Sequence, residues 1–312
     1  MEKLTILNPF VVGRYISPDY FCDREQETAF LIKQIENGRN VALISPRRMG
    51  KTGLIHHTFH QEELTHHFHT FFVDIYATTS LAEFVYLLGK AIYDEPSFDI
   101  SLGDIQTPQT TLDEIFEYLE AADMPCVVAI DEFQQISNYE EKNVEAMLRT
   151  KIQQCKQTQF IFAGSKRHLM SNMFNSSSKP FYQSAISMGL NPIPLETYTI
   201  FAIRLFEERG KQVSSELIQQ VYQQFNGCTW FVQMLMNELF SLTAHNELCN
   251  TDKLELAMQN VITTQEGSYQ DLMSHLAPKQ KLILQAIARE GKAKAVRTSK
   301  SFQIPKVIHY YI

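Results

Sequence analysis

One short segment, residues 41–57, constrains the fold of this chain more than any other. Its sequence, VALISPRRMGKTGLIHH, begins with an apolar, β-type run, continues through a loop with a glycine, and ends in a helix-compatible stretch that starts at Lys51. A strand followed by such a loop and a helix turns several backbone N–H groups toward one point at the helix N-terminus, where an anion binds. The segment therefore predicts a phosphate-binding loop.

This loop matches the pattern G-x-x-x-x-G-K-[ST] at Gly50, Lys51 and Thr52, whereas Ser45 replaces the first glycine. Gly50 still permits the close approach of backbone to phosphate, and Pro46 favours an extended Ser45 at the loop entrance. We expect Lys51 to reach the β- and γ-phosphates and the Thr52 hydroxyl to ligate Mg²⁺. The expected nucleotide-binding residues of the loop are Pro46, Arg47, Arg48, Met49, Gly50, Lys51, Thr52 and Gly53.

Two further apolar runs end in polar residues suited to phosphate chemistry. The run CVVAI is followed by Asp131 and Glu132, and QFIFAG is followed by Ser165. We expect Asp131 to support the metal, Glu132 to orient and deprotonate an attacking water, and Ser165 to contact the γ-phosphate. The candidate catalytic residues are thus Glu132, Lys51 and Ser165. The chain has no N-K-x-D sequence of the kind that selects guanine, so the expected nucleotide is ATP.

Strand-like and helix-like segments alternate through the first two thirds of the chain. Strands that are apolar throughout, and that are separated by helices, are typical of a parallel sheet covered on both faces. Further strands are predicted at residues 70–76, 126–131, 159–164 and 185–190, and helices at 24–37, 81–92, 111–122 and 140–156. The predicted fold class is α/β.

Beyond the prolines of residues 191–196 the pattern changes to helices only. They are predicted at residues 199–210, 214–225, 230–245, 252–264 and 277–291, the last with a proline in its first turn and a glycine at its end. The sequence therefore predicts a core at residues 1–192, a helical domain at 193–275 and a short C-terminal segment at 276–312.

Composition excludes several classes of protein. A formal net charge of −7 argues against a chain that coats nucleic acid with its whole surface. The five cysteines are far apart and form no C-x-x-C pair, which fits a reducing compartment. We find no leader-like start and no apolar run that could span a bilayer, so we expect a cytoplasmic protein without membrane contact.

Taken together, these motifs resemble the AAA-like ATPases of archaea and bacteria, which are related to the STAND class of signal-transduction NTPases. The resemblance rests on NPF, YFCDRE, SPRRMGKT, IDEFQ, FAGS and KPFYQSA, which begin at Asn8, Tyr20, Ser45, Ile130, Phe162 and Lys179. It implies a P-loop NTPase core of the ASCE type, a helical lid and a winged-helix domain. Residues 276–296 resemble the first helix and turn of a winged helix, and we expect this module to be incomplete.

The resemblance also implies an adenine-binding wall formed by Phe10, Phe21 and Arg24. From composition alone the two phenylalanines could equally be core residues, because most aromatic side chains are buried.

The roles of two groups of cations stay open at the sequence level. Arg47 and Arg48 could stabilise phosphate charge or form salt bridges with Asp131, Glu132 or a neighbouring loop. The C-terminal basic segment could contact DNA or simply be solvated; it comprises Lys292, Lys294, Arg297, Lys300 and Lys306.

Four residues after the loop have spacing that suits a transition metal. His56 and His60 lie four apart, with Glu63 and His67 at further helical steps. Histidines on the exposed face of a helix need no metal, and that is the reading we favour.

The sequence thus predicts an ATP- and Mg²⁺-binding ATPase that acts as a nucleotide-driven switch. The alternative is a nucleotide-dependent regulator that binds DNA or protein with little turnover. We expect a protein partner, and the C-terminal basic segment makes DNA a further candidate. A second copy of the chain is another candidate partner.

Overall fold

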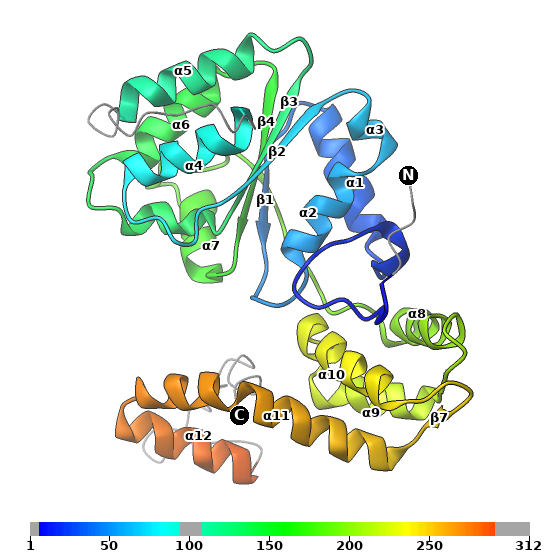
Figure 1. Cartoon of the computed structure of the whole chain (residues 1–312). Coiled ribbons are helices and arrows are strands. Elements are labelled where there is room, and N and C mark those ends of the chain that lie inside the picture. The colour runs from blue at the N-terminus through cyan, green and yellow to red at the C-terminus, as the bar shows by residue number, and fades with distance from the viewer. Residues whose placement is uncertain (1–5, 94–107, 291–312) are drawn as a thin grey trace. The chain divides into compact units, whose positions relative to one another are not determined.

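The computed structural model describes residues 6–93 and 108–290, and the chain divides into two compact units (Figure 1). Gly13–Ile193 forms an α/β unit, and Met1–Val12 together with Pro194–Ile312 forms a helical unit. The division after Ile193 lies next to the predicted boundary, but the sequence placed the first twelve residues with the core. They group with the helical unit because Phe10 is fully buried among three of its phenylalanines, Phe201, Phe206 and Phe240.

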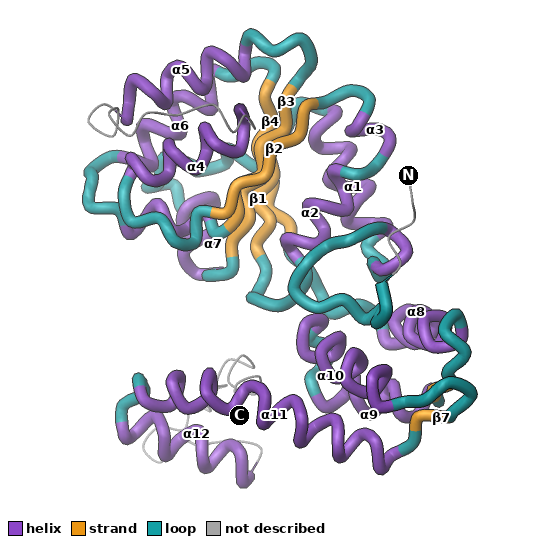
Figure 2. The backbone as a smooth tube through the Cα atoms, in the orientation of Figure 1, coloured by secondary structure: helices purple, strands orange, loops and turns teal. Residues whose placement is uncertain are grey.

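The α/β unit is built on a five-stranded sheet with the strand order β2-β3-β4-β1-β5 (Figure 2). All neighbouring strands are parallel, which confirms the predicted fold class. The strands are β1 Val41–Ile44, β2 His69–Asp74, β3 Cys126–Asp131, β4 Thr158–Gly164 and β5 Ile186–Met188. Since β4 lies between β1 and β3, the phosphate loop and the acidic strand end are separated by one strand.

Helices cover both faces of the sheet because its central strands are apolar on both sides. Every residue of β3 and β4 is buried. One face is covered by α4 Leu81–Tyr93, α5 Pro108–Glu120, α6 Val144–Gln154 and α7 Arg167–Asn175 (Figure 1). The other is covered by α1 Glu25–Glu36, α2 Lys51–Phe59 and α3 Glu62–Thr65.

Short helices are the elements that the sequence pattern did not predict in this unit. They are α3, α7 and the 3₁₀ helices η1 Pro18–Tyr20 and η3 Phe133–Asn138. The predicted helix at residues 140–156 starts later, at Val144, because Asn143 adopts a left-handed conformation with φ 66°. Elements this short carry too few residues to show a periodicity.

The helical unit contains five helices among its described residues. They are α8 Leu195–Glu207, α9 Ser215–Gln224, α10 Thr229–Leu242, α11 Thr251–Ser274 and α12 Pro278–Glu290. Two strands of two residues each, β6 Gln212–Val213 and β7 Leu248–Cys249, pair in parallel, although only helices were predicted here. The helix α11 continues past the predicted end at residue 264, through Gly267. The C-terminal basic segment lies outside the described residues.

The segment around Asn8 is tied to α10 by reciprocal hydrogen bonds. Asn8 Nδ2 donates to the Asn237 carbonyl at 2.8 Å, and Asn237 Nδ2 donates to the Phe10 carbonyl at 2.7 Å. Phe10 packs edge-on against Phe206 with ring centroids 5.5 Å apart.

No helix within residues 6–93 and 108–290 is long and apolar enough to cross a membrane.

Candidate nucleotide-binding site

The loop between β1 and α2 has the backbone of an anion-binding turn. Gly50 is left-handed, with φ 91°, and directly precedes the first residue of α2, so the N-terminus of this helix opens onto the loop. Arg48 is also left-handed, with φ 68°, whereas Ser45 has no positive φ. The Ser45 N–H instead donates to the Gly164 carbonyl of β4 at 3.3 Å. Ser45 therefore needs no glycine-like freedom, which explains why the first glycine of the pattern is dispensable here.

Lys51 lies inside this loop with its ammonium group turned toward loop carbonyls. Its Nζ donates to the Ser45 carbonyl at 3.1 Å and to the Pro46 carbonyl at 3.2 Å, and the residue is 6% exposed. Burial lowers the pKa of Lys51, while the nearby carboxylates of Asp131 and Glu132 oppose that shift. A buried ammonium beside a helix N-terminus is well placed to pair with phosphate oxygens.

Thr52 and Asp131 come together although 79 positions separate them. The Thr52 hydroxyl donates to Asp131 Oδ2 at 2.6 Å, and Asp131 Oδ1 accepts the Glu132 N–H at 2.9 Å. A hydroxyl and a carboxylate are hard oxygen ligands of the kind that Mg²⁺ takes beside phosphates. These two residues therefore fit the metal that the sequence assigned to them.

Glu132 and Ser165 also meet, at the ends of adjacent strands β3 and β4. The Ser165 hydroxyl donates to Glu132 Oε2 at 2.8 Å, and Gln134 Nε2 donates to the same oxygen. Glu132 has φ 55° and directly precedes the 3₁₀ helix η3. All three predicted catalytic residues thus lie in the same unit, and two of them are directly hydrogen-bonded.

Arg47 is the exposed cation of the loop, and it lies over an aromatic ring. Its guanidinium carbon is 5.0 Å from the Tyr76 ring centroid. The Tyr76 N–H donates to Asp74 Oδ1 at 2.8 Å, which shapes the turn that carries the ring. Asp74 pairs with Asp131 in the sheet register, and its pKa is raised by burial and by the nearby Asp131 and Glu132 carboxylates.

The three residues implied to form an adenine wall occupy different places. Phe21 stacks on His57 of α2, with ring centroids 4.3 Å apart, and lies so close to Gly53 that a Cβ there would be 3.3 Å from its ring. It therefore borders the first turn of α2. Phe10 lies instead in the core of the helical unit.

Arg24, the third of these residues, is a buried tie between loop segments. It is 4% exposed, and its Nη2 donates to the Asn191 carbonyl at 2.7 Å and to the Met49 carbonyl at 3.5 Å. Its Nη1 is paired with Glu27 at 2.6 Å. These contacts hold the phosphate loop, through the Met49 carbonyl, against the start of α1 and the segment around Asn191.

The spacing of His56, His60, Glu63 and His67 does not produce a metal site. The helix α2 ends at Phe59, so the later residues do not continue its face. The ring centroid of His56 lies 4.5 Å from that of Phe72, whereas the ring centroid of His60 lies 5.2 Å from that of Tyr15. Within the described parts of the chain, no group of three or more His, Cys, Asp or Glu residues could hold a metal ion.

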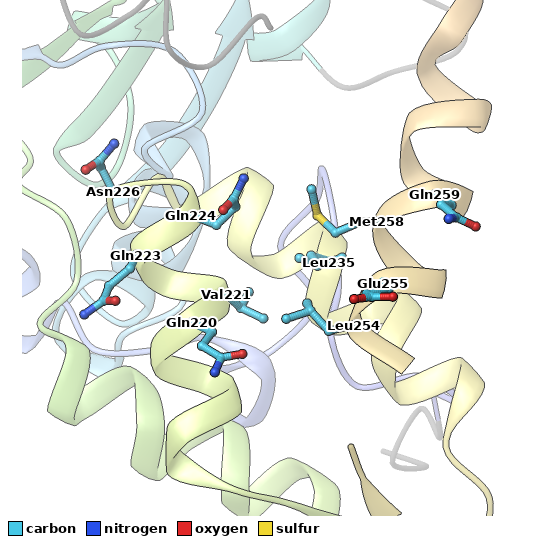
Figure 3. A pocket seen from close by; sticks show the side chains of 10 residues that line it. All are labelled: Gln220, Val221, Gln223, Gln224, Asn226, Leu235, Leu254, Glu255, Met258 and Gln259. Carbon is cyan, nitrogen blue, oxygen red and sulfur yellow. The ribbon is translucent and has the colours of Figure 1, made fainter. Parts of the chain in front are cut away.

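A separate groove of about 830 Å³ lies in the helical unit, between α9, α10 and α11 (Figure 3). Val221, Leu235 and Leu254 form its apolar floor, and side-chain amides dominate its rim. Its lining is Gln220, Val221, Gln223, Gln224, Asn226, Leu235, Leu254, Glu255, Met258 and Gln259. This lining contains a carboxylate and no cation, so the groove is unsuited to phosphate.

Three residues of the site escaped the sequence analysis as functional candidates: Asp74, Tyr76 and Gln134. Gln134 belongs to the quoted IDEFQ motif, but the motif alone does not show that its amide is buried against Glu132. Asp74 and Tyr76 lie in the last three residues of the strand predicted at 70–76, and the end of a parallel strand was the available signal for them.

Solved structures with the same fold are P-loop ATPases. The Walker-type ATPase PABY2304 of Pyrococcus abyssi has 20% identity and a TM-score of 0.68, over 90% of this chain and 84% of that one. The ORC2 protein of Aeropyrum pernix, solved as ADPNP–ADP complexes, has 14% identity and a TM-score of 0.67, over 91% and 78%. The RuvB branch migration motor of Thermotoga maritima has 16% identity and a TM-score of 0.53, over 89% and 81%. The fold is therefore that of an AAA-like P-loop ATPase.

The family follows from the sequence itself. A profile of ATPase domains found predominantly in Archaea matches residues 21–235, which span both the phosphate loop and the acidic strand end. The chain belongs to this family of ATPase domains. A comparison with curated proteins found no match.

Proposed function

We propose that this chain binds ATP with Mg²⁺ and hydrolyses it to ADP and phosphate. The observation that carries the proposal is the chain of contacts at the loop, in which Thr52, Asp131, Glu132 and Ser165 are linked by hydrogen bonds of 2.6–2.9 Å. An acidic pair and a serine gathered at a phosphate loop have the composition that phosphoryl transfer to water requires.

Each residue has a role that its position supports. Lys51 and the N-terminus of α2 bind the phosphates, and Phe21 borders the side of the loop where the adenine would lie. Thr52 and Asp131 would hold Mg²⁺, which supplies positive charge against the phosphate oxygens when bound. Arg47, exposed over Tyr76, would add a further positive charge near the γ-phosphate.

The reaction needs one proton acceptor, and Glu132 is the carboxylate placed for it. The oxygen of a water forms a bond to the γ-phosphorus, and the bond from this phosphorus to the β–γ bridging oxygen breaks. The proton of the water passes to Glu132, and ADP leaves with the bridging electron pair. Ser165, bonded to Glu132, would contact the γ-phosphate and so link the state of the nucleotide to the carboxylate.

The output that we propose is a nucleotide-driven switch, in which phosphate occupancy changes the contacts of Glu132 and Ser165. Its receiver would be a protein partner or a second copy of the chain. A second candidate function is a DNA-associated regulator with little turnover. The ORC1 protein of Aeropyrum pernix, solved in complex with DNA, shares this fold over 88% of the chain, which favours that candidate.

The test is phosphate release from Mg-ATP, measured beside equilibrium ATP binding. We expect Lys51→Ala to weaken binding at least about tenfold, because it removes charged hydrogen bonds to phosphate. Glu132→Gln should retain binding but lower turnover by about 10²–10⁴, because an amide accepts no proton. The matched control is Lys33→Ala, which removes an exposed lysine of α1 and should change neither quantity.

Unchanged turnover in Glu132→Gln would show that Glu132 is not the general base. Tight binding without turnover in the intact chain would instead favour the regulator, and salt-dependent DNA retention that is lost on deletion of residues 292–306 would then identify its ligand.

A further inference from the structure

A buried glutamine lies behind the acidic end of β3. Gln134 is 1% exposed and is the second residue of η3, directly after Phe133. Its side chain lies beside the end of β4. Its Oε1 atom is buried without a hydrogen-bond partner. A buried amide with an unpaired oxygen destabilises the fold, and an apolar residue of similar size would fill the same space without that penalty. This cost in folding free energy, at a residue beside the candidate catalytic carboxylate, indicates a role for the NH₂ group of the Gln134 amide.

This NH₂ group contacts the carboxylate proposed as the base. Gln134 Nε2 donates to Glu132 Oε2, and the Ser165 hydroxyl donates to the same oxygen at 2.8 Å. Two donors on one oxygen fix the plane of the carboxylate. The other carboxylate oxygen of Glu132, Oε1, accepts no hydrogen bond from the described protein residues. It is therefore the oxygen left to accept a proton from water.

The backbone of Glu132 has an anchor of its own, which it needs because it is left-handed with φ 55°. A non-glycine residue adopts this conformation at an energetic cost, and surrounding contacts must maintain it. The Glu132 N–H is held by Asp131 Oδ1 at 2.9 Å. Its side chain is held by Gln134 and Ser165, so backbone and carboxylate are both anchored.

The neighbouring strand leaves room for this glutamine. A Cβ on Gly164, the last residue of β4, would lie 2.3 Å from Gln134 Oε1 and 2.5 Å from Met170 Cγ. No side chain fits there unless Gln134 or Met170 moves. A glycine at the end of β4 is therefore the structural complement of the buried amide.

We infer that Gln134 is a positioning residue for ATP hydrolysis: it anchors one oxygen of Glu132 so that the other faces the attacking water. The inference rests on the proposed function, in which Glu132 is the base. It predicts that the amide N–H of Gln134 matters for turnover and matters little for ATP binding or folding.

The test compares the same substitution at two adjacent glutamines. Gln134→Met keeps the length of the side chain and removes the donor, and Gln135→Met is the matched control, because Gln135 Nε2 donates to the Thr78 carbonyl at 3.1 Å and not to Glu132. We expect Gln134→Met to lower kcat at least about tenfold, because a misplaced base loses alignment. Its Kd for ATP should stay within about twofold, and its Tm should not fall.

The control should show the opposite pattern. Gln135→Met should leave kcat unchanged and lower Tm by about 2–4 °C, because it leaves a backbone carbonyl without its donor. In Glu132→Gln, adding Gln134→Met should cause no further loss of turnover, because the two residues act through one carboxylate.

Three results would overturn the inference alone: unchanged kcat in Gln134→Met, a parallel fall of kcat and Tm in that variant, or an additive loss in the double variant. An intact chain that binds ATP without hydrolysing it would overturn the proposed function first, and this inference with it. The intact chain therefore separates the two failures.

Discussion

The two units bury very different kinds of side chain. The helical unit has an apolar core built around Phe10, Phe206 and Phe240, and Thr243 is its single buried polar residue among those that the structure describes. The α/β unit buries charged residues as well, namely Arg24, Lys51 and Asp131. Burial of charge costs free energy unless each charge is paired. The difference fits the proposal that the α/β unit carries the chemistry, whereas the described core of the helical unit is almost entirely apolar.

Left-handed residues show the same contrast. In the helical unit they are Asn226, Asn246, Gly210 and Gly227, the residue types that adopt this conformation readily. In the α/β unit they include Arg24, Arg48 and Glu132, which adopt it at a cost. Backbone strain of this kind concentrates at functional sites. Four pairs of substitutions test the comparison, and the largest effect is expected in the apolar core.

Phe10→Ala should lower the free energy of unfolding of the helical unit by about 3–5 kcal/mol, because it removes a fully buried ring from three aromatic neighbours. Denaturant unfolding followed by circular dichroism measures it. The control is Leu7→Ala, at a side chain that is 90% exposed, which should change stability by less than about 0.5 kcal/mol. Equal stability of the two variants would show that the N-terminal segment does not belong to this core.

Arg24→Lys should destabilise the α/β unit by about 1.5–3 kcal/mol, because a single ammonium cannot replace the guanidinium fork that reaches Asn191, Met49 and Glu27. Urea unfolding provides the measurement. The same change at the exposed Arg39 serves as control and should be neutral. If Arg24→Lys were equally neutral, the buried charge would not support the loop.

Gly164→Ala should cost about 1–3 kcal/mol, because its Cβ would overlap Gln134 and Met170. Gly267→Ala should have the opposite sign and stabilise α11 by about 0.5–1 kcal/mol, because nothing lies within 4 Å of a Cβ there and alanine favours helix. Thermal unfolding of both variants compares them directly. Similar shifts in both would contradict the close packing behind Glu132.

Ser214→Ala should produce the smallest loss, about 1 kcal/mol, because the Ser214 hydroxyl caps α9 by accepting the Leu217 N–H at 3.2 Å. The adjacent Ser215→Ala is the control, and it should change stability by less than about 0.5 kcal/mol. Chemical denaturation can resolve the two. An effect confined to Ser215 would show that the cap is assigned to the wrong residue.

Much of the fold could be predicted because its signals are local. An apolar run forms a strand, and the G-K-T that follows starts a helix, through interactions within a few residues. The strand β1 and the start of α2 at Lys51 therefore match the expectation, although α2 ends earlier than expected, at Phe59. The failures have different causes. The helix α11 runs through Gly267 to Ser274 although its local sequence suggested an earlier end, and its last buried residue is Val261. Phe10, by contrast, is placed by tertiary contacts, because it joins the core of a unit that lies far along the chain.

The candidate site divides in the same way. Residue types and spacing selected Lys51, Thr52, Asp131, Glu132 and Ser165, because phosphate and metal chemistry needs those groups at strand ends. The spacing of His56 and His60 suited a metal, although the sequence analysis favoured histidines without one; in the structure α2 ends at Phe59 and the two rings pack against different neighbours. Gln134 carried no chemical signal by itself, because a glutamine becomes informative only when its burial is known.

By itself, the sequence determined that the chain forms a parallel α/β core with a phosphate loop, since strand and helix periodicity and the G-K-T turn are encoded over short distances. Only the tertiary structure decided that Thr52 meets Asp131, that Ser165 meets Glu132, and that Gln134 holds the same carboxylate. The physical reason is that side chains that follow β1, β3 and β4 become neighbours through the strand order of the sheet, and linear spacing does not contain that order.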